Sequence, residues 1–314
     1  MASLSEPKVV PAQPARVALP MMVGARTVLR LHRRLVRVSL PLREVLAGSL
    51  PALPPLAAGA HGYLINSLPA ALLPALRAAH PALSLFVRQR YRRSYASLEG
   101  GFEAYLGGFS AKSRSTLKRK VRRFAERSGG TLDLRRYSAP AEVEEFHRFA
   151  RAVSARTYQE KLLGAGLPDG DQALAAMRAL AAQDRMRGWV LFLDGAPVSY
   201  LYAPAEGDAL IYSHLGYDPA AAALSPGTVL QLEAMRQLMA EGRFALFDFT
   251  EGEGQHKLQF GTGGVECVDL LLLRQGAGNR LTGLALGGFD RGVALAKAAV
   301  HRLGLERLAR RLRR

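Results

Sequence analysis

Alternating apolar stretches divide the chain from residue 131 onward into a regular series of strands and helices. Residues 189–217, WVLFLDGAPVSYLYAPAEGDALIYSHLGY, predict three strands joined by a DG turn and an EGD turn, which is typical of an antiparallel meander. The elements predicted around the meander are a strand at 131–138, helices at 141–167 and 171–186, a helix at 225–242, a strand at 244–250, a short helix at 256–261 and a strand at 265–274.

The first part of the chain has a less regular pattern. Residues 1–20 are rich in proline and alanine, and we expect a flexible tail there. Strand-like runs cover 28–38 and 83–95, with a short helix at 71–80 between them. Residues 102–130 predict two helices. Ser110 or Ser113 can cap the second of these, and Gly129 with Gly130 can end it.

Composition indicates a folded protein from a reducing compartment. The apolar fraction of 49% over 314 residues is enough for a substantial core. Cys267 is the single cysteine, which excludes an intramolecular disulfide and a cysteine-based metal site. We find neither a secretory leader at the start nor about 20 consecutive apolar residues. We therefore expect a cytoplasmic protein without a bound metal.

The net charge of +17 is concentrated in two segments. Residues 112–127 carry +7 and residues 290–314 carry +6. Nearly pure positive charge favours an anionic partner: a phosphorylated substrate, an anionic membrane surface or a nucleic acid. Nucleic acid is the weaker prediction, because no RNA-binding aromatic pattern accompanies the charge. The basic, amphipathic segment 276–314 could give peripheral contact with the inner membrane, or it could pack on the protein itself.

Residues 248–260, DFTEGEGQHKLQF, are the first candidate for chemistry. Their glycine spacing does not fit a phosphate-binding P-loop, and one histidine beside scattered carboxylates is a weak metal signal. Asp248 or Glu251 could accept a proton, and Lys257 could stabilise an oxyanion or hold a phosphate. Alternatively, Asp248 caps the turn and forms an ion pair with Lys257.

Two neighbouring segments add further candidates. Tyr212, His214 and Tyr217 fall on the last meander strand or just beyond it, and the alternation places Tyr212 and His214 on one face. The helix that starts at Ser225-Pro226-Gly227 has Ser225 as its N-cap, and exposed amides at such a start bind anions. The plain alternatives are core aromatics and an ordinary capped helix.

The order of elements resembles the GNAT acyltransferase fold, a mixed α/β sheet that splays between the last meander strand and the strand after the central helix. IYSHLGYDP, SPGTVLQLEAMRQLMAEG and RFALFDFTEGEGQHKLQFG resemble the FemAB-like and CelD-like branch, which is associated with cell-envelope and polysaccharide biosynthesis. That branch typically has a Tyr-Lys pair where this chain has His256 and Lys257. The resemblance covers about residues 98–275 and implies an N-acyltransferase acting on an envelope or exopolysaccharide precursor.

The resemblance also implies roles for individual residues. Acyl-CoA, such as acetyl-CoA, would meet Ser225, Gly227 and Thr228, and Tyr212 or Tyr217 would protonate the leaving group. The residues implied to line the side of an anionic or phosphorylated acceptor are Lys118, Arg119, Arg122, Tyr158, His214 and His256. By analogy, residues 21–110 form a degenerate GNAT-like half, 111–275 the acyltransferase domain and 276–314 the basic helix.

Two other functions stay open. The start AAAALSPGT lacks the glycine pattern with which GNAT enzymes receive the CoA pyrophosphate, and FemAB-like relatives use aminoacyl-tRNA instead. A protein that keeps the fold but only binds nucleic acid or anionic lipid is the third alternative.

Overall fold

Two long strands, β4 (Leu83–Ser97) and β11 (Gly263–Arg274), contain the points at which the chain passes between its two structural units. Unit 1 comprises residues 1–91 and 265–314, and unit 2 comprises residues 92–264. The computed structural model describes residues 13–23, 26–157, 166–251 and 254–302. The domain boundaries at residues 110 and 275, which were given by analogy, stay a prediction.

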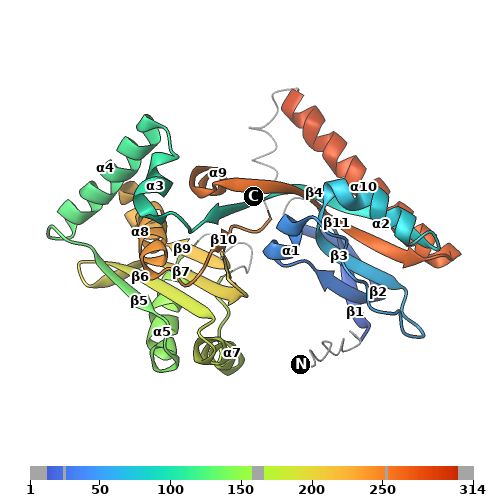
Figure 1. Cartoon of the computed structure of the whole chain (residues 1–314), viewed down its shortest axis with the longest axis horizontal. Helices are drawn as coiled ribbons and strands as arrows, with labels where there is room; N and C mark the ends of the chain where they lie inside the picture. The colour runs from blue at the N-terminus through green and yellow to red at the C-terminus, as the bar shows by residue number, and fades with distance from the viewer. Residues whose placement is uncertain (1–12, 24–25, 158–165, 252–253, 303–314) are drawn as a thin grey trace, which may run out of the picture. The chain divides into compact units, whose positions relative to one another are not determined.

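In its described residues, unit 1 is a small sheet with three helices and a 3-10 turn (Figure 1). Its strands run in the order β1-β2-β3-β11, with β2 and β3 parallel and the other neighbours antiparallel. The elements besides β4 and β11 are β1 (Ala15–Val23), β2 (Arg26–Ser39), α1 (Leu42–Ala47), β3 (Gly62–Pro69), η1 (Ala70–Leu72), α2 (Leu73–Ala79) and α10 (Ala277–Arg302). β1 therefore begins inside the segment predicted as a flexible tail over residues 1–20.

Unit 2 contains a mixed sheet with strand order β4-β10-β8-β7-β6-β5, and β9 pairs with β7 beside it. Its strands are β5 (Asp133–Tyr137), β6 (Met186–Leu193), β7 (Ala196–Glu206), β8 (Ala209–Ile211), β9 (His214–Tyr217) and β10 (Leu246–Asp248). Its helices are α3 (Gly101–Gly107), α4 (Ala111–Arg127), η2 (Pro140–Glu142), α5 (Val143–Ser154), α7 (Asp171–Ala182), η3 (Pro219–Leu224), α8 (Pro226–Glu241) and α9 (Gln255–Phe260). The predicted mixed α/β architecture is confirmed.

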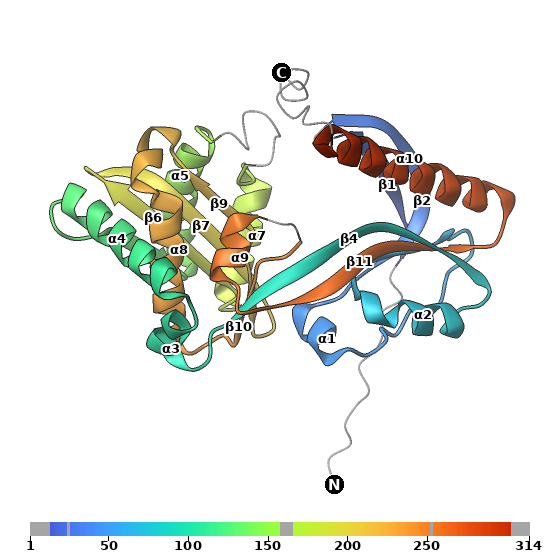
Figure 2. The ribbon, with the colours of Figure 1, turned by 90° about the horizontal axis from the view of Figure 1, so that it is seen from above.

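Both faces of this sheet are covered by helices, which explains why β6 and β7 are apolar along most of their length. Trp189 and Leu191 point to the core under α3, α4 and α8, whereas Val190 and Phe192 point to the core under α5 and α7. Figures 1 and 2 show these two sets of helices on opposite sides of the strands. The strict alternation is the period of two that an extended chain imposes.

The sequence signals for element ends hold in most places. The hydroxyl oxygen of Ser110 accepts a hydrogen bond from the amide of Ser113 at 3.2 Å, so Ser110 is the cap of α4. Asp194 and Gly195, with φ of 51° and 74°, make the DG turn between β6 and β7. α8 starts at Pro226 and ends before Gly242, whose φ of 64° is left-handed.

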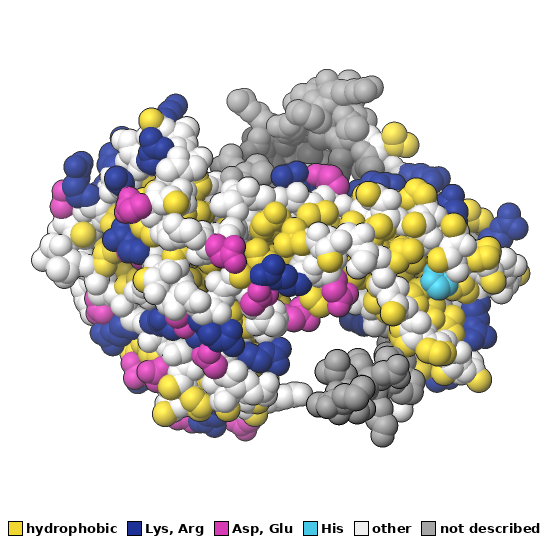
Figure 3. All heavy atoms as spheres, in the orientation of Figure 1, with side chains coloured by type: hydrophobic (Ala, Val, Ile, Leu, Met, Phe, Trp, Pro, Cys, Tyr) yellow, Lys and Arg dark blue, Asp and Glu magenta, His cyan; other side chains and the backbone are white. Residues whose placement is uncertain are grey.

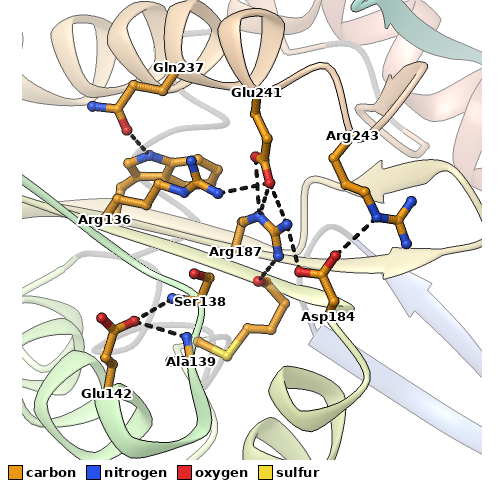
Figure 4. Close-up of polar contacts among 11 residues, drawn as sticks. Arg136, Ser138, Ala139, Glu142, Asp184, Arg187, Gln237, Glu241 and Arg243 are labelled. Atoms are coloured by element: carbon orange, nitrogen blue, oxygen red, sulfur yellow. Dashed lines mark hydrogen bonds and ion pairs between the residues drawn. The ribbon is translucent and has the colours of Figure 1, made fainter.

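A buried arginine fastens the C-terminal end of α8 to the sheet (Figure 4). Arg187 on β6 is 2% exposed and donates to the carboxylate of Glu241 on α8, with a shortest distance of 2.5 Å. Arg136 on β5 contacts the same carboxylate at 2.8 Å. Trp189 donates from Nε1 to Oε1 of Gln237 at 2.8 Å, one turn earlier on α8. The C-terminal end of α8 is consequently anchored to β5 and β6.

Candidate active site

The pairing between strands β8 and β10 ends at the point where the candidate residues begin. Both run parallel as far as the pair Ile211 and Asp248, and the amide of Tyr212 still donates to the carbonyl of Asp248 at 2.8 Å. β9 then pairs with β7, through Ser199 to Tyr202. The chain was predicted to form one strand here, but it is interrupted at residues 212–213, and this interruption produces the expected splay.

The interruption corrects one prediction about side chains. Tyr212 packs against Phe247 and Phe249, with ring centroids 6.3 Å and 5.8 Å away, in the core under α8. His214 instead lies 6.2 Å from the ring of Tyr202, which belongs to the core under α5 and α7. The prediction that Tyr212 and His214 share a face was wrong, because the break in the strand interrupts the alternation.

A pocket of about 270 Å³ opens at the start of α8, next to β9. The residues that line it are Tyr212, Leu215, Tyr217, Ala222, Ser225, Pro226, Gly227, Thr228, Gln231 and Phe260. Five of the residues singled out in the sequence thus come together here: the two tyrosines and the three residues at the helix start. Tyr217 is 43% exposed, whereas burial raises the pKa of the Tyr212 hydroxyl far above its ordinary value.

The start of α8 differs in detail from the expected cap. Ser225 occupies the N-cap position with a left-handed φ of 53°, and its side chain makes no capping hydrogen bond. Its carbonyl accepts the amides of Thr228 and Val229 at 3.0 Å and 3.1 Å. Gly227 permits close approach to β9, since a Cβ atom there would lie 3.1 Å from Cδ2 of Leu215.

A lysine from the basic helix reaches this helix start. The Nζ of Lys120 on α4 lies 3.4 Å from Oγ1 of Thr228. The ammonium group therefore adds to the positive end of the α8 dipole, and together they favour an anion at this mouth of the pocket. Lys120 was recognised in the sequence only as one of several charges on its helix.

The other basic residues expected to bind the acceptor lie on the exposed face of α4. Lys118, Arg119 and Arg122 are exposed, and Arg122 is 3.6 Å from Glu126 in a surface pair. Figure 3 shows Lys and Arg side chains along this helix, at the upper left. None of the three lines the pocket. Tyr158 and the side chain of His256 lie outside the described residues.

Asp248 is held in a buried ion pair with a residue that the sequence did not suggest. Its Oδ2 accepts from the guanidinium of Arg93 on β4 at 2.5 Å, and the two side chains are 1% and 8% exposed. Its Oδ1 accepts the amide of Thr250 at 2.8 Å. Asp248 therefore caps the turn, as the alternative interpretation held, but its ion-pair partner is Arg93 rather than Lys257.

Lys257 is 8% exposed on α9, and its Nζ donates to the backbone carbonyl of Glu251. Burial lowers the pKa of its amine, and the charges of Glu251 and Asp248 partly oppose that shift. The Glu251 side chain is exposed. Neither Lys257, Glu251 nor Asp248 lines the pocket, so the turn and the pocket are neighbouring but separate features.

His214 is not among the residues that line the pocket, and its ring lies beside Tyr202. Its Nδ1 lies 2.8 Å from Oγ of Ser213, and burial lowers the pKa of its imidazole. Within the described residues, no group of three or more His, Cys, Asp or Glu side chains could hold a metal ion.

Gln231 is the polar pocket residue that the sequence analysis missed. Its side chain is 1% exposed, and no described residue hydrogen-bonds to either polar atom of its amide. In the sequence it lies inside the run VLQLEAM, where a single glutamine resembles an ordinary helix residue.

Comparison with known proteins agrees with this architecture. Residues 111–258 match the family model described as an acetyltransferase (GNAT) domain. No curated protein matches the chain. Among solved structures, FemX is similar with a TM-score of 0.53 at 10% identity, covering 71% of this chain and 74% of FemX. The C-terminal domain of a protein described as a lysylphosphatidylglycerol synthetase from Agrobacterium fabrum has a TM-score of 0.49 at 16% identity, covering 75% and 73% of the two chains.

The family match runs from α4 into α9, and it includes the turn and every lining residue of the pocket except Phe260. The similarity to FemX concerns the fold alone. Residues 111–258 therefore resemble a GNAT-type domain both in the family model and in fold.

Proposed function

We propose that this protein is an N-acyltransferase that moves an acyl group from acyl-CoA to an amino group of an envelope or exopolysaccharide precursor. The observation that carries the proposal is the pocket where β8 and β10 part, which opens at the positive end of α8 within a GNAT-type domain. The sequence resemblance to FemAB-like and CelD-like proteins supplies the class of acceptor.

The donor phosphates would lie at the start of α8. Of the first four residues of the helix, Pro226 has no amide hydrogen, and the amides of Thr228 and Val229 already donate to Ser225. The amide of Gly227 and the ammonium group of Lys120 are then the groups offered to an anion. This is a sparse phosphate site, which makes the contribution of Lys120 large.

The chemistry is a direct transfer within one complex. The acceptor amine attacks the thioester carbonyl, the carbon–sulfur bond breaks, and the amine proton passes to a base while the thiolate takes up a proton. Tyr212 lines the pocket, and burial raises the pKa of its hydroxyl, so this group stays protonated and is proposed to donate a hydrogen bond to the leaving sulfur, which takes its proton from water. Of the two carboxylates considered as bases, the exposed Glu251 is favoured, because Asp248 is engaged by Arg93.

The sparse phosphate site also favours a second candidate, an aminoacyl-tRNA donor. Such a donor carries its phosphates along a polynucleotide, and the exposed basic face of α4 with Lys118, Arg119 and Arg122 suits that backbone. In this version, the helix start would hold only the end of the nucleic acid.

Binding measurements with both donors separate the two candidates. We expect CoA to bind the wild-type protein and Lys120→Ala to weaken that binding about tenfold, because one charge-assisted contact is lost. Lys112→Ala, an exposed change on the same helix, is the matched control and should bind CoA like the wild type. Strong, salt-sensitive binding of aminoacyl-tRNA with no affinity for CoA would favour the second candidate instead.

The proposed acceptor is anionic, and unit 1 offers a surface for a membrane-bound one. A groove of about 520 Å³ in this unit is lined by four arginines and a single carboxylate, among them Arg77, Arg90 and Arg291. Leu281 and Leu284 on α10 are 70% and 59% exposed beside it. We propose peripheral contact with anionic lipid here, from the cytoplasmic side. None of the helices in the described part of the chain is both long and apolar enough to cross a bilayer.

A further inference from the structure

The amide of Gln231 is an unexplained polar group in an otherwise apolar part of unit 2. It is 1% exposed, it lines the pocket at the start of α8, and neither Nε2 nor Oε1 has a partner among the described residues. Buried amides in folded proteins are almost always hydrogen-bonded, because leaving one unpaired is costly. An unpaired amide that faces a pocket therefore points to a ligand group.

Its position on α8 identifies which end of the donor it would meet. Gln231 follows Gly227 by four residues and so lies on the same helix face, about 6 Å further along the axis. The phosphates are proposed to bind at Gly227 and Lys120, so Gln231, which is buried one turn further along the helix, would meet the acyl end of the donor.

The size and lining of the pocket restrict the chemistry of the acyl end of the donor further. A volume of about 270 Å³ is below the usual range for a drug-sized ligand, so the pocket can hold an acyl group but not a whole coenzyme. Among the described residues that line it, none has a charged side chain. A charged acyl group would therefore be buried without a counter-charge.

We propose that Gln231 selects an acyl group that carries a neutral hydrogen-bonding group, a hydroxyl or a carboxamide. Such a group can donate to Oε1 and accept from Nε2 at the same time, which pairs both atoms of the glutamine. This inference rests on the proposed function, in that the pocket receives the acyl end of acyl-CoA. It excludes plain alkyl chains as the preferred substrates, and it disfavours an aminoacyl group with its ammonium charge.

Binding of the donor alone tests this role of Gln231, so the acceptor does not have to be identified. Titration calorimetry would compare CoA, butyryl-CoA and 3-hydroxybutyryl-CoA on the wild-type protein and on Gln231→Leu. We expect the wild type to bind 3-hydroxybutyryl-CoA at least about tenfold more tightly than butyryl-CoA, because the analogue without the hydroxyl leaves the amide unpaired. In Gln231→Leu that ratio should fall to about one, while CoA itself binds both proteins equally.

The outcomes separate this inference from the function on which it rests. If both proteins bind all three ligands and have the same ratio of affinities for 3-hydroxybutyryl-CoA and butyryl-CoA, the inference is overturned but the proposed function is not. Absence of binding by CoA and by both acyl forms overturns the proposed donor, and the inference with it. Thermal unfolding of the free proteins is the second measurement: the melting temperature of Gln231→Leu should equal or exceed that of the wild type. A lower one would show that the amide is paired in the free protein, which also overturns the inference.

Discussion

The carboxylate of Asp248 is 1% exposed and lies 2.5 Å from the guanidinium of Arg93 on the neighbouring strand β4. Removing one partner of such a pair leaves the other charge buried and uncompensated, which costs about 3–5 kcal/mol. We expect Arg93→Met to lower the free energy of unfolding by about 3 kcal/mol, as measured by urea denaturation. The double variant Arg93→Met with Asp248→Asn, which keeps the turn cap but removes both charges, should recover most of the loss.

Arg127→Met is the matched control for this experiment. Arg127 lies 3.1 Å from Asp194, but both side chains are 60% exposed, so the loss should stay below about 1 kcal/mol. Equal losses in Arg93→Met and in the control would show that the inner pair is open to water. If the prediction holds, inactivity of an Asp248 variant reflects lost structure and does not identify the base.

His214 should make stability depend on pH. Burial lowers the pKa of its imidazole below the ordinary 6.5, so the unfolded chain takes up a proton before the folded protein does. The free energy of unfolding should therefore fall as the pH falls through 6.5 toward the folded-state pKa. Urea denaturation of His214→Gln over the same range should give a flatter pH profile. An identical profile in the variant would assign the dependence to other groups.

Single residues were the hardest features to predict from the sequence. The motif residues Ser225 and Gly227 do lie at a pocket, because a helix start is fixed by local signals. Arg93 gave no signal, since it lies 155 residues from Asp248 in the sequence and on a strand with several other arginines. Gln231 gave none either, because an unpaired amide can be recognised only once its surroundings are known.

At the scale of elements, the position of α8 depends on the ion pairs at its C-terminal end (Figure 4). Glu241→Gln would leave Arg187, which is 2% exposed, with only the exposed Asp184 as a charged partner. We expect a loss of about 1–3 kcal/mol in the free energy of unfolding. The single tryptophan, Trp189, bonds to Gln237 on the same helix, so its fluorescence reports directly whether α8 stays docked.

Glu126→Gln on α4 serves as the comparison for Glu241→Gln. Its pair with Arg122 is fully on the surface, and its loss should change stability by less than about 0.5 kcal/mol. Unchanged tryptophan fluorescence and stability in Glu241→Gln would mean that apolar packing alone positions α8.

Most elements of unit 2 were predictable, because turns and caps are encoded locally. The DG turn, the cap of α4 and the Pro226 start of α8 all appear where the sequence placed them. The break at residues 212–213 did not, because IYSHLGY keeps a strand-like pattern across it. The break depends on pairing with two different strands, β10 before it and β7 after it, and that is tertiary information.

At the scale of the whole molecule, the protein should recognise membrane charge. We expect it to sediment with vesicles that contain phosphatidylglycerol and not with vesicles of pure phosphatidylcholine, since arginines and exposed leucines of unit 1 suit anionic lipid. Leu281→Ser with Leu284→Ser should weaken binding about tenfold or more, because two apolar side chains lose their burial in lipid.

Leu50→Ser, which changes another exposed leucine of unit 1, is the control and should bind vesicles like the wild type. Equal binding by all three proteins would limit the contact to charge alone. Binding to neutral and anionic vesicles alike would contradict the electrostatic part of the proposal.

The division into units could not be foreseen from the apolar pattern. β4 and β11 each continue past a unit boundary without a break, and a sequence pattern marks domain ends only where it is interrupted. Whether unit 1 descends from a GNAT-like half stays a prediction.

Unit 1 is assembled from both ends of the chain, whereas unit 2 is one continuous stretch. A ribosome releases residues 92–264 before β11, so unit 2 has all its strands while β3 still lacks its partner on one side. An unpaired strand edge of this kind is prone to join other chains. Synthesis that stalls after residue 264 would therefore yield a complete unit 2 attached to a sheet that tends to aggregate.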